Sequence, residues 1–208
     1  MPSHSLPSLA LGCLGAFLCG SIPFGLVLVK LAGKGDIREH GSGNIGATNV
    51  SRVGGKALGI VTLLLDIAKG FLPVFLGKQL GWSESVLSLL ALSAVLGHVF
   101  TPWLKFQGGK GVATALGVAL AFRAAMVLPA LGLFIALVLV FRYVSLGSVM
   151  AALALPLILA WRGATPVVLI LWAGISLIVI AKHHENIRRL LKGTESPLWG
   201  AKKEDAHG

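Results

Sequence analysis

Charged side chains are scarce in this sequence, since only 12% of its 208 residues are Asp, Glu, Lys or Arg. Soluble domains carry about 25% charged residues. With 55% hydrophobic residues and a mean hydropathy of +0.85, the chain does not have the composition of a soluble globular domain. The composition therefore predicts a membrane protein before any motif is considered.

Acidic residues and cysteines are also few, which limits the chemistry of any site. The two cysteines, Cys13 and Cys19, lie in the first apolar stretch, where we expect no structural disulfide. The sequence has no H-E-x-x-H, C-x-x-C or carboxylate cluster, so we expect neither a metal nor paired-carboxylate catalysis. The net charge of +10 comes from basic residues spread over short loops without interleaved aromatics, so we expect no nucleic-acid partner.

Long apolar stretches are what the sequence does have, and a bilayer-spanning helix needs about 20 such residues. Stretch 111–141 is too long for one span and carries Arg123 near its middle, so we divide it there into a short and a longer helix. The sequence thus predicts an all-α, polytopic membrane protein with seven transmembrane helices. They come from stretches 8–29, 57–77, 85–104, 111–141, 143–161 and 163–181.

Basic residues divide unequally between the two alternating sets of loops. One set holds only Lys78, Arg123 and Arg162. The positive-inside rule then places the N-terminus outside and the C-terminus in the cytoplasm. We expect residues 1–195 to form one membrane-embedded domain and 196–208 to be a disordered cytoplasmic tail. The cytoplasmic set holds 14 basic residues: Lys30, Lys34, Arg38, Arg52, Lys56, Lys105, Lys110, Arg142, Lys182, Arg188, Arg189, Lys192, Lys202 and Lys203.

Three polar, glycine-bearing segments remain between the apolar stretches. They are GSGNIGATNVSR at 41–52, FQGGKGVAT at 106–114 and HHENIRRLLKGTE at 183–195. In the predicted topology all three face the cytoplasm, so we expect them to lie near one another at one membrane face.

The first polar segment matches a dinucleotide-binding fingerprint in its letters. Gly41, Gly43 and Gly46 spell G-x-G-x-x-G, and Asp66 follows at about the spacing of the acidic residue in that motif. The fingerprint needs a preceding buried strand, whereas the neighbouring stretches here are apolar helices. Asp66 lies inside a predicted span, where we expect it to pair with Lys69. We therefore reject dinucleotide binding.

The glycines of this segment still let backbone N–H groups converge on an anion, and a following helix N-terminus adds positive potential. Ser42 adds a donor, and the forked side chain of Arg52 suits phosphate. We interpret the segment as a phosphate-binding loop, with a tight turn that binds nothing as the alternative. The predicted substrate-binding residues are Gly41, Gly43, Asn44, Gly46, Thr48 and Asn49.

The second segment repeats this chemistry around Lys110. Gly108, Gly109 and Gly111 bracket the lysine, so we expect the backbone to approach a ligand closely here. The segment is not a Walker A loop, because Leu104 occupies the place of the first glycine and Gly111 that of the Ser or Thr. The alternative is a lysine that only marks the inner side of the membrane.

In the third segment, His183 and Asn186 are three residues apart and share a helical face, with Arg189 near it. We expect His184 to be a bystander. His98, in GHVFTP, either joins this cluster or hydrogen-bonds a neighbouring helix. An ordinary interfacial role for His183 is the alternative.

Together with LLLDIAKG, LGHVFTPW and RYVSLGS, in this order, the three segments resemble the bacterial acyl-phosphate:glycerol-3-phosphate acyltransferase family. The resemblance covers nearly the whole chain except the tail. It implies a multi-pass enzyme of the bacterial inner membrane that uses no cofactor. This enzyme would transfer a fatty acyl group from acyl phosphate to the sn-1 hydroxyl of glycerol 3-phosphate, the first acylation in phospholipid synthesis. The products would be lysophosphatidate and phosphate.

The resemblance also implies the site and a functional link to the enzyme that makes acyl phosphate. The implied catalytic residues are Ser42, Arg52, Lys110, His183 and Asn186. We expect Lys110 and Arg52 to clamp phosphates, and Asn186 and Ser42 to orient substrate. His183 either deprotonates the attacking hydroxyl or only positions it while a substrate phosphate takes the proton. An acyl-enzyme on Ser42 is a third possibility.

Two other classes of protein fit parts of the sequence. A transporter for a small phosphorylated solute would also combine apolar helices with cationic loops. Against it, the polar segments gather on one predicted face, and no paired broken helices in two related halves are visible. An inactive membrane scaffold is the remaining alternative.

Overall fold

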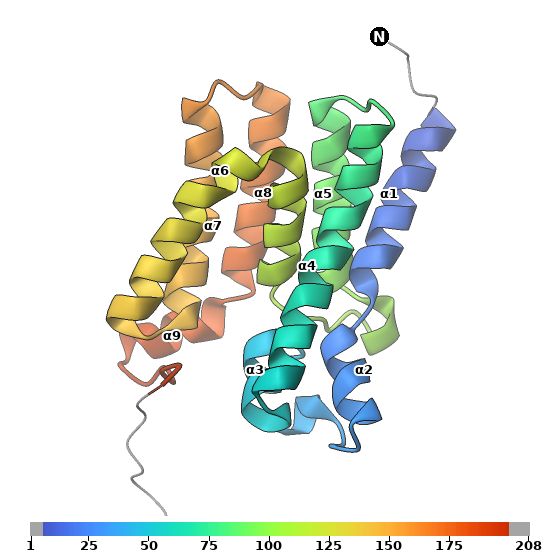
Figure 1. Cartoon of the computed structure of the whole chain (residues 1–208). Helices are drawn as coiled ribbons and strands as arrows, with labels where there is room; N and C mark the ends of the chain where they lie inside the picture. Colours follow the sequence, from blue (N-terminus) through green and yellow to red (C-terminus); the bar gives the residue numbers. More distant parts are fainter. Residues whose placement is uncertain (1–5, 200–208) are drawn as a thin grey trace, which may run out of the picture.

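The structure, a computed structural model, describes residues 6–199 of the chain. No strand occurs within this range, so the prediction of an all-α protein is confirmed (Figure 1). Its helices are α1 Leu6–Ser21, α2 Phe24–Leu31, η1 Ile37–Glu39, α3 Ala47–Gly54, α4 Lys56–Gln79, α5 Glu84–Val99, η2 Pro102–Leu104, α6 Val112–Phe141, α7 Val144–Trp161, α8 Pro166–Ala181 and α9 His184–Leu191.

Every predicted apolar stretch contains at least one helix. Four helical segments are long and apolar enough to cross a membrane: α1 with α2, α4, α5 with η2, and α7. A fifth is present if α8 and α9, which meet at 58°, count as one bent span. The two halves of α6, Val112–Ala125 and Val127–Phe141, are apolar but shorter. The number of spans and their orientation therefore stay predictions.

The predicted division of stretch 111–141 at Arg123 is confirmed. Arg123 has non-helical backbone angles inside α6 (φ −155°, ψ 92°), and its guanidinium pairs with Glu84 at the start of α5. Lys78 Nζ donates to the carbonyl oxygens of Ala121 at 3.5 Å and Phe122 at 3.4 Å, directly before the break. Figure 1 shows the two halves of α6 meeting at an angle at the upper end of the bundle.

Glycines bring the helix backbones of the bundle close together. A side chain at Gly20 of α1 would overlap the backbone of Ala94 in α5, and one at Gly117 of α6 would overlap Ile67 in α4. Small residues at such crossings are typical of membrane helices, because packing rather than hydrophobicity drives their association. These contacts fix the helices whose ends carry the polar segments.

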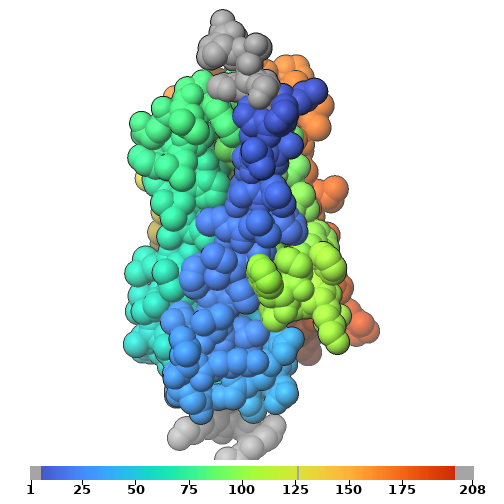
Figure 2. All heavy atoms as spheres, turned by 90° about the vertical axis from the view of Figure 1, so that its right-hand side faces the viewer, coloured from blue at the N-terminus to red at the C-terminus, as the bar shows by residue number. Residues whose placement is uncertain are grey.

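The first predicted span contains a break that the sequence analysis did not predict. α1 ends at Ser21 and α2 begins at Phe24, because Pro23 has no N–H to continue the helical ladder. The segment that contains η2 packs beside α1 and α2 (Figure 2). Thr101 Oγ1 donates to Ser21 O at 2.7 Å, and Trp103 Nε1 donates to Ser21 Oγ at 2.8 Å.

All three polar segments lie at one end of the bundle. α2, η1, α3, η2 and α9 gather at the lower end in Figure 1, whereas α1 begins at the upper end. The prediction that the polar segments share one face is therefore confirmed as geometry. The part of the predicted tail that is described, 196–199, contacts this end: Leu198 N–H donates to Arg142 O at 2.7 Å. The rest of that tail, 200–208, lies outside the described residues.

Candidate active site

The first loop, residues 41–46, is a turn that leads into α3. Gly41 and Gly43 have φ angles of +61° and +68°, in the left-handed region that glycine adopts without steric cost. The N–H of Gly46 donates to Asn44 Oδ1 at 2.8 Å, and α3 begins at the next residue. Part of the predicted glycine pattern is thus explained by the turn itself.

Asn49 holds the first loop together. Its Nδ2 donates to the carbonyl oxygens of His40 at 3.0 Å, Asn44 at 2.9 Å and Ile37 at 3.4 Å, and its Oδ1 accepts from Ser42 N–H at 2.9 Å. The residue is only 2% exposed. Its amide is therefore committed to the loop backbone, and donation to a substrate, as predicted, would require these bonds to be exchanged.

Arg52, in the last turn of α3, contacts the start of the predicted tail, directly after the third polar segment. This exposed residue donates from Nη2 to Ser196 O at 3.4 Å. Ser42 is also exposed, while Thr48 is partly buried. The described hydrogen bond of Ser42 is made by its backbone to Asn49, within its own loop.

The second loop, residues 107–111, packs against the end of α5. The N–H of Gly108 donates to Val99 O at 3.0 Å, and the N–H of Gly109 donates to His98 O at 3.2 Å. A side chain at Gly109 would collide with the imidazole of His98. The close approach that these glycines permit is therefore, in this structure, an approach to α5; their predicted approach to a ligand stays a prediction.

Lys110 connects the second loop to the third polar segment. Its Nζ donates to Asn186 Oδ1 at 2.5 Å, and Asn186 Nδ2 donates to Glu195 Oε1 at 2.6 Å. The same carboxylate accepts from Ser145 Oγ and from Arg189 Nε, each at 2.7 Å. This set of hydrogen bonds, from Lys110 through Asn186 to Glu195, is called the Lys110 chain below.

Burial and neighbouring charges shift the pKa values of Lys110 and Glu195, the two ends of the Lys110 chain. Burial lowers the pKa of Lys110; Glu195 and Glu185 oppose this effect, while Arg189 and Arg52 add to it. Burial disfavours the ionised form of Glu195, but hydrogen bonds from Asn186, Ser145 and Arg189 outweigh it and hold its pKa below the usual range. Glu195 is therefore a carboxylate that closes the chain as an acceptor.

His183 lies buried beside this chain, at the junction of α8 and α9. Its Nδ1 lies 2.7 Å from Val179 O. A carbonyl only accepts hydrogen bonds, so Nδ1 carries the proton and Nε2 keeps a lone pair. Burial lowers the pKa of His183 to about 4, Val179 opposes this shift, and Lys110 adds to it. The imidazole is therefore a neutral acceptor at physiological pH.

The other two histidines that the sequence singled out lie apart from this acceptor. His184 is exposed, and its Nδ1 lies 2.9 Å from Ala181 O, which fits the predicted bystander. His98 is buried at 4% exposure in α5, where its carbonyl supports Gly109. It thus contacts the second loop and not His183.

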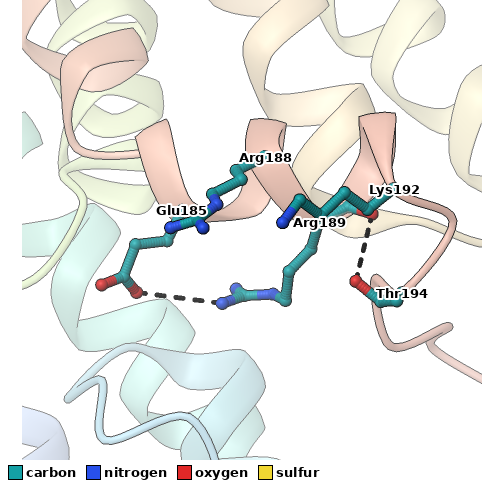
Figure 3. A pocket seen from close by; sticks show the side chains of 5 residues that line it. All are labelled: Glu185, Arg188, Arg189, Lys192 and Thr194. Carbon is teal, nitrogen blue, oxygen red and sulfur yellow. Dashed lines mark hydrogen bonds and ion pairs between the residues drawn. The ribbon is translucent and has the colours of Figure 1, made fainter.

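A hollow of about 390 Å³ opens beside α9 (Figure 3). Glu185 and Arg189 point toward one another across it, with Oε2 and Nη1 3.8 Å apart, and Thr194 Oγ1 lies 3.5 Å from Arg189 O. Arg189 also belongs to the hydrogen bonds of Glu195, so the hollow adjoins the Lys110 chain. Arg188 and Lys192 complete a lining in which cations outnumber anions, and such a lining attracts phosphate-bearing solutes.

Comparison with known proteins identifies the family of this membrane bundle. A sequence profile described as glycerol-3-phosphate acyltransferase matches residues 10–193. The chain belongs to the glycerol-3-phosphate acyltransferase family. Glycerol-3-phosphate acyltransferases of Trichlorobacter lovleyi and Geobacter sulfurreducens are 55% and 51% identical to it. These alignments cover 88% and 87% of this chain and 93% of each relative.

Solved structures of a glycerol-3-phosphate acyltransferase share the fold. The crystal structure of PlsY (YgiH), an integral membrane glycerol 3-phosphate acyltransferase, in its glycerol 3-phosphate form matches with a TM-score of 0.88 at 42% identity. This match covers 93% of the chain and 96% of PlsY. The lysophosphatidic acid form of PlsY matches with a TM-score of 0.84 at 41% identity, over 91% of this chain and 95% of PlsY. The predicted family, membrane fold and acyltransferase class are confirmed.

Within this acyltransferase, the structure brings Lys110 and Asn186 into direct contact, and Lys110 is near enough to lower the pKa of His183. In the described part of the chain, Arg52 forms no hydrogen bond with these three residues, but its charge lowers the pKa of Lys110. Among residues 6–199 no group of three or more His, Cys, Asp or Glu is placed to hold a metal ion. Sequence reasoning missed Glu195 as part of the site. The signal was its place as the last residue of the third segment, but nothing local shows that its carboxylate reaches Asn186.

Proposed function

We propose that this acyltransferase transfers a fatty acyl group from acyl phosphate to the sn-1 hydroxyl of glycerol 3-phosphate and releases lysophosphatidate and phosphate. The observation that carries the proposal is the Lys110 chain, which lies beside the free Nε2 of His183 at one end of an apolar bundle. Family membership supports glycerol 3-phosphate as the acceptor. The two forms of PlsY, with glycerol 3-phosphate and with lysophosphatidic acid, correspond to the acceptor and product of this reaction.

The donor follows from the charge and chemistry of the site. Acyl phosphate is a mixed anhydride that is already activated, so its reaction needs no cofactor. Both substrates carry a phosphate, and Lys110 and Arg52 supply the cations that two phosphates require. The donor also carries a fatty chain, which the apolar flank of the bundle accommodates, whereas the soluble acceptor arrives through the cationic hollow beside α9.

The transfer itself is a direct displacement. The acceptor hydroxyl oxygen attacks the acyl carbonyl carbon, the bond from that carbon to the phosphate oxygen breaks, and the hydroxyl proton ends on the departing phosphate. His183 Nε2 accepts a hydrogen bond from the attacking hydroxyl and orients it. Because the pKa of His183 is about 4, it retains a proton less well than a phosphate monoester such as glycerol 3-phosphate, whose second pKa is about 6. This comparison favours phosphate as the final proton acceptor.

A direct displacement also fits the environment of Ser42. An acyl-enzyme would need a base beside the Ser42 hydroxyl, but Ser42 is exposed and its described contact runs from its backbone to Asn49. We therefore assign the Ser42 hydroxyl to substrate binding. Lys110 and Arg52 hold phosphates and stabilise the charge that develops on the carbonyl oxygen and the leaving group.

The cellular setting follows from the charge distribution and the substrates. We place the enzyme in the bacterial inner membrane with the N-terminus outside and the polar end in the cytoplasm, as the loop charges predict. Acyl phosphate is reactive toward water, so the enzyme that makes it must act immediately before this one.

Purified protein in liposomes, supplied with acyl phosphate and radiolabelled glycerol 3-phosphate, tests the proposal. We expect an extractable, labelled lysolipid. No labelled lysolipid should form when radiolabelled glycerol is supplied instead of radiolabelled glycerol 3-phosphate. Parallel reactions with acyl-CoA and with acylated acyl carrier protein test the donor. The proposal would be contradicted if either of these donors gave product and acyl phosphate gave none. Label that enters the liposome lumen without forming lysolipid would indicate a transporter instead.

A further inference from the structure

We propose that the buried Asp66–Lys69 ion pair of α4 fixes the position of the first loop relative to the second. Asp66, Lys69 and His98 are then positioning residues of this acyltransferase. The kinetic part of this inference rests on the proposed function, and its structural part does not.

The ion pair is an unusual feature for the interior of a membrane bundle. Lys69 Nζ and Asp66 Oδ1 lie 2.7 Å apart, and their side chains are 2% and 3% exposed. The sequence predicted that these two residues pair. Taking both charges out of water costs as much as their attraction returns, so apolar residues of similar size would stabilise α4 equally well. The contacts of the two side chains indicate a role other than stability.

Lys69 supports the first loop through the break between α1 and α2. Its Nζ donates to Ile22 O at 2.7 Å and lies 5.7 Å from the ring centroid of Phe24, the first residue of α2. The next residue, Gly25, approaches the carbonyl of Ile45 so closely that no side chain fits between them. Ile45 belongs to the first loop, so Lys69 holds the end of the helix on which that loop rests.

Asp66 packs against His98, which in turn contacts the second loop. Asp66 Oδ1 lies 3.9 Å from His98 Nδ1, which is beyond hydrogen-bonding distance, so the two buried side chains are in packing contact only. The His98 carbonyl accepts from the N–H of Gly109, and its imidazole covers the face of Gly109 that carries no side chain. Gly109 is followed directly by Lys110, so His98 is the one residue that lies between Asp66 and the segment that carries the catalytic lysine.

The two supports meet in one ion pair. The first loop leads to Arg52 and the second to Lys110, and both cations must face the same pair of substrates. If the ion pair is lost, each loop keeps its own internal hydrogen bonds, but the position of one loop relative to the other is no longer fixed. A displacement of about 1 Å between catalytic groups lowers rates by about 10²-fold.

The test replaces the pair with apolar residues of similar size, Asp66→Leu with Lys69→Met, so that no unpaired charge is left in the bundle. We expect kcat/KM for glycerol 3-phosphate to fall by about 10²-fold. Hydrogen–deuterium exchange, followed by mass spectrometry, should accelerate in both loops and stay unchanged in α7 and α8. Glu84→Leu with Arg123→Met is the matched control, because it removes an ion pair that touches neither loop; it should leave both loop exchange rates unchanged.

A second variant keeps the inference testable if the double variant does not fold. His98→Gln interrupts only the support of the second loop, so exchange should accelerate in residues 107–111 and not in 41–46. The inference is overturned if this variant loosens both loops or neither. It is also overturned if the double variant keeps wild-type kcat/KM or leaves either loop unchanged. Wild-type protein that fails to use acyl phosphate would refute the proposed donor, and the exchange rates would still decide whether the pair joins the loops.

Discussion

Lys110 donates a 2.5 Å hydrogen bond to the side-chain carbonyl of Asn186, a residue 76 positions later in the chain. The other half of the Asn186 amide donates to Glu195, so the orientation of this amide follows from a donor on one side and an acceptor on the other. The second and third polar segments are thereby joined through one side chain.

Lys110→Gln removes the cation but keeps a side chain that can hydrogen-bond to Asn186. We expect kcat/KM to fall by about 10² to 10³-fold, as for the loss of one group that stabilises transition-state charge. Lys105→Gln, an exposed lysine close by in the chain, is the control and should change kcat/KM by less than about twofold. Steady-state rates with acyl phosphate measure both; equal effects would show that Lys110 contributes only to the general positive charge.

Glu195→Gln replaces an acceptor of three hydrogen bonds with a group that must present an amide N–H to one of its donors. We expect Asn186 to lose its fixed orientation and kcat/KM to fall by about 10-fold or more. Glu185→Gln, whose side chain is 71% exposed, is the matched control and should alter kcat/KM by less than about twofold. A control variant as impaired as Glu195→Gln would point to charge in the hollow rather than to orientation.

The dependence of activity on pH separates the two proposed roles of His183. Its pKa of about 4 lies below the ordinary 6.5, so the folded protein keeps this imidazole neutral between these values, where an unfolded histidine takes up a proton. Any stability gained from the neutral form is therefore present above pH 6.5 and is lost as the pH falls toward 4.

The rate of the reaction has a separate dependence on pH. Because a substrate phosphate takes the proton in the proposed mechanism, the acid limb of kcat should lie near pH 6, where phosphate monoesters titrate.

His183→Ala should lower kcat by about 10²-fold and leave that acid limb in place, because positioning is lost and the proton acceptor is not. His184→Ala, which changes an exposed neighbour, should leave kcat within about twofold of wild type. Profiles of kcat against pH for the three proteins make the measurement. If the limb disappears in His183→Ala alone, His183 is the base.

Asn49→Ala removes the four hydrogen bonds that hold the first loop. We expect the free energy of unfolding to fall by about 1–3 kcal/mol and KM for glycerol 3-phosphate to rise. Ser42→Ala keeps the backbone bond to Asn49, so it should lower activity at unchanged stability. Thermal unfolding measured beside KM distinguishes the two variants, and a stable Asn49→Ala protein would refute the holding role of this amide.

The proposed orientation is tested by thiol labelling. Lys34→Cys and Arg162→Cys place single exposed thiols on loops at opposite ends of the bundle, while the native Cys13 and Cys19 lie in the first span. In spheroplasts, an impermeant maleimide should label Arg162→Cys, and it should label Lys34→Cys only after the membrane is opened. The reverse pattern would invert the topology.

Much of this architecture follows from local physics that a sequence displays. Twenty apolar residues predict a span, an arginine in mid-span predicts the break at Arg123, and a spacing of three predicts the Asp66–Lys69 pair. The break before Pro23 was also present in the sequence, but the uncharged stretch 8–29 concealed it. Boundaries set by a single proline are easily lost inside a long apolar run.

The remaining features depend on contacts between distant segments. Gly109 has no side chain because His98 lies against it, and Glu195 reaches the site because α9 turns back beneath α7. Neither contact has a period or a spacing along the chain. Asn49 illustrates the same limit, since an asparagine after a glycine turn looks equally suited to a ligand and to its own loop.

The Lys110 chain also couples the packing of two helices to the site. Its carboxylate, Glu195, accepts hydrogen bonds from Ser145 of α7 and from Asn186 and Arg189 of α9. A shift of α7 relative to α9 would therefore disturb Glu195, and through Asn186 it would change the amide that faces Lys110. A substitution in the contact between α7 and α9 can thus lower activity without touching any residue that binds substrate.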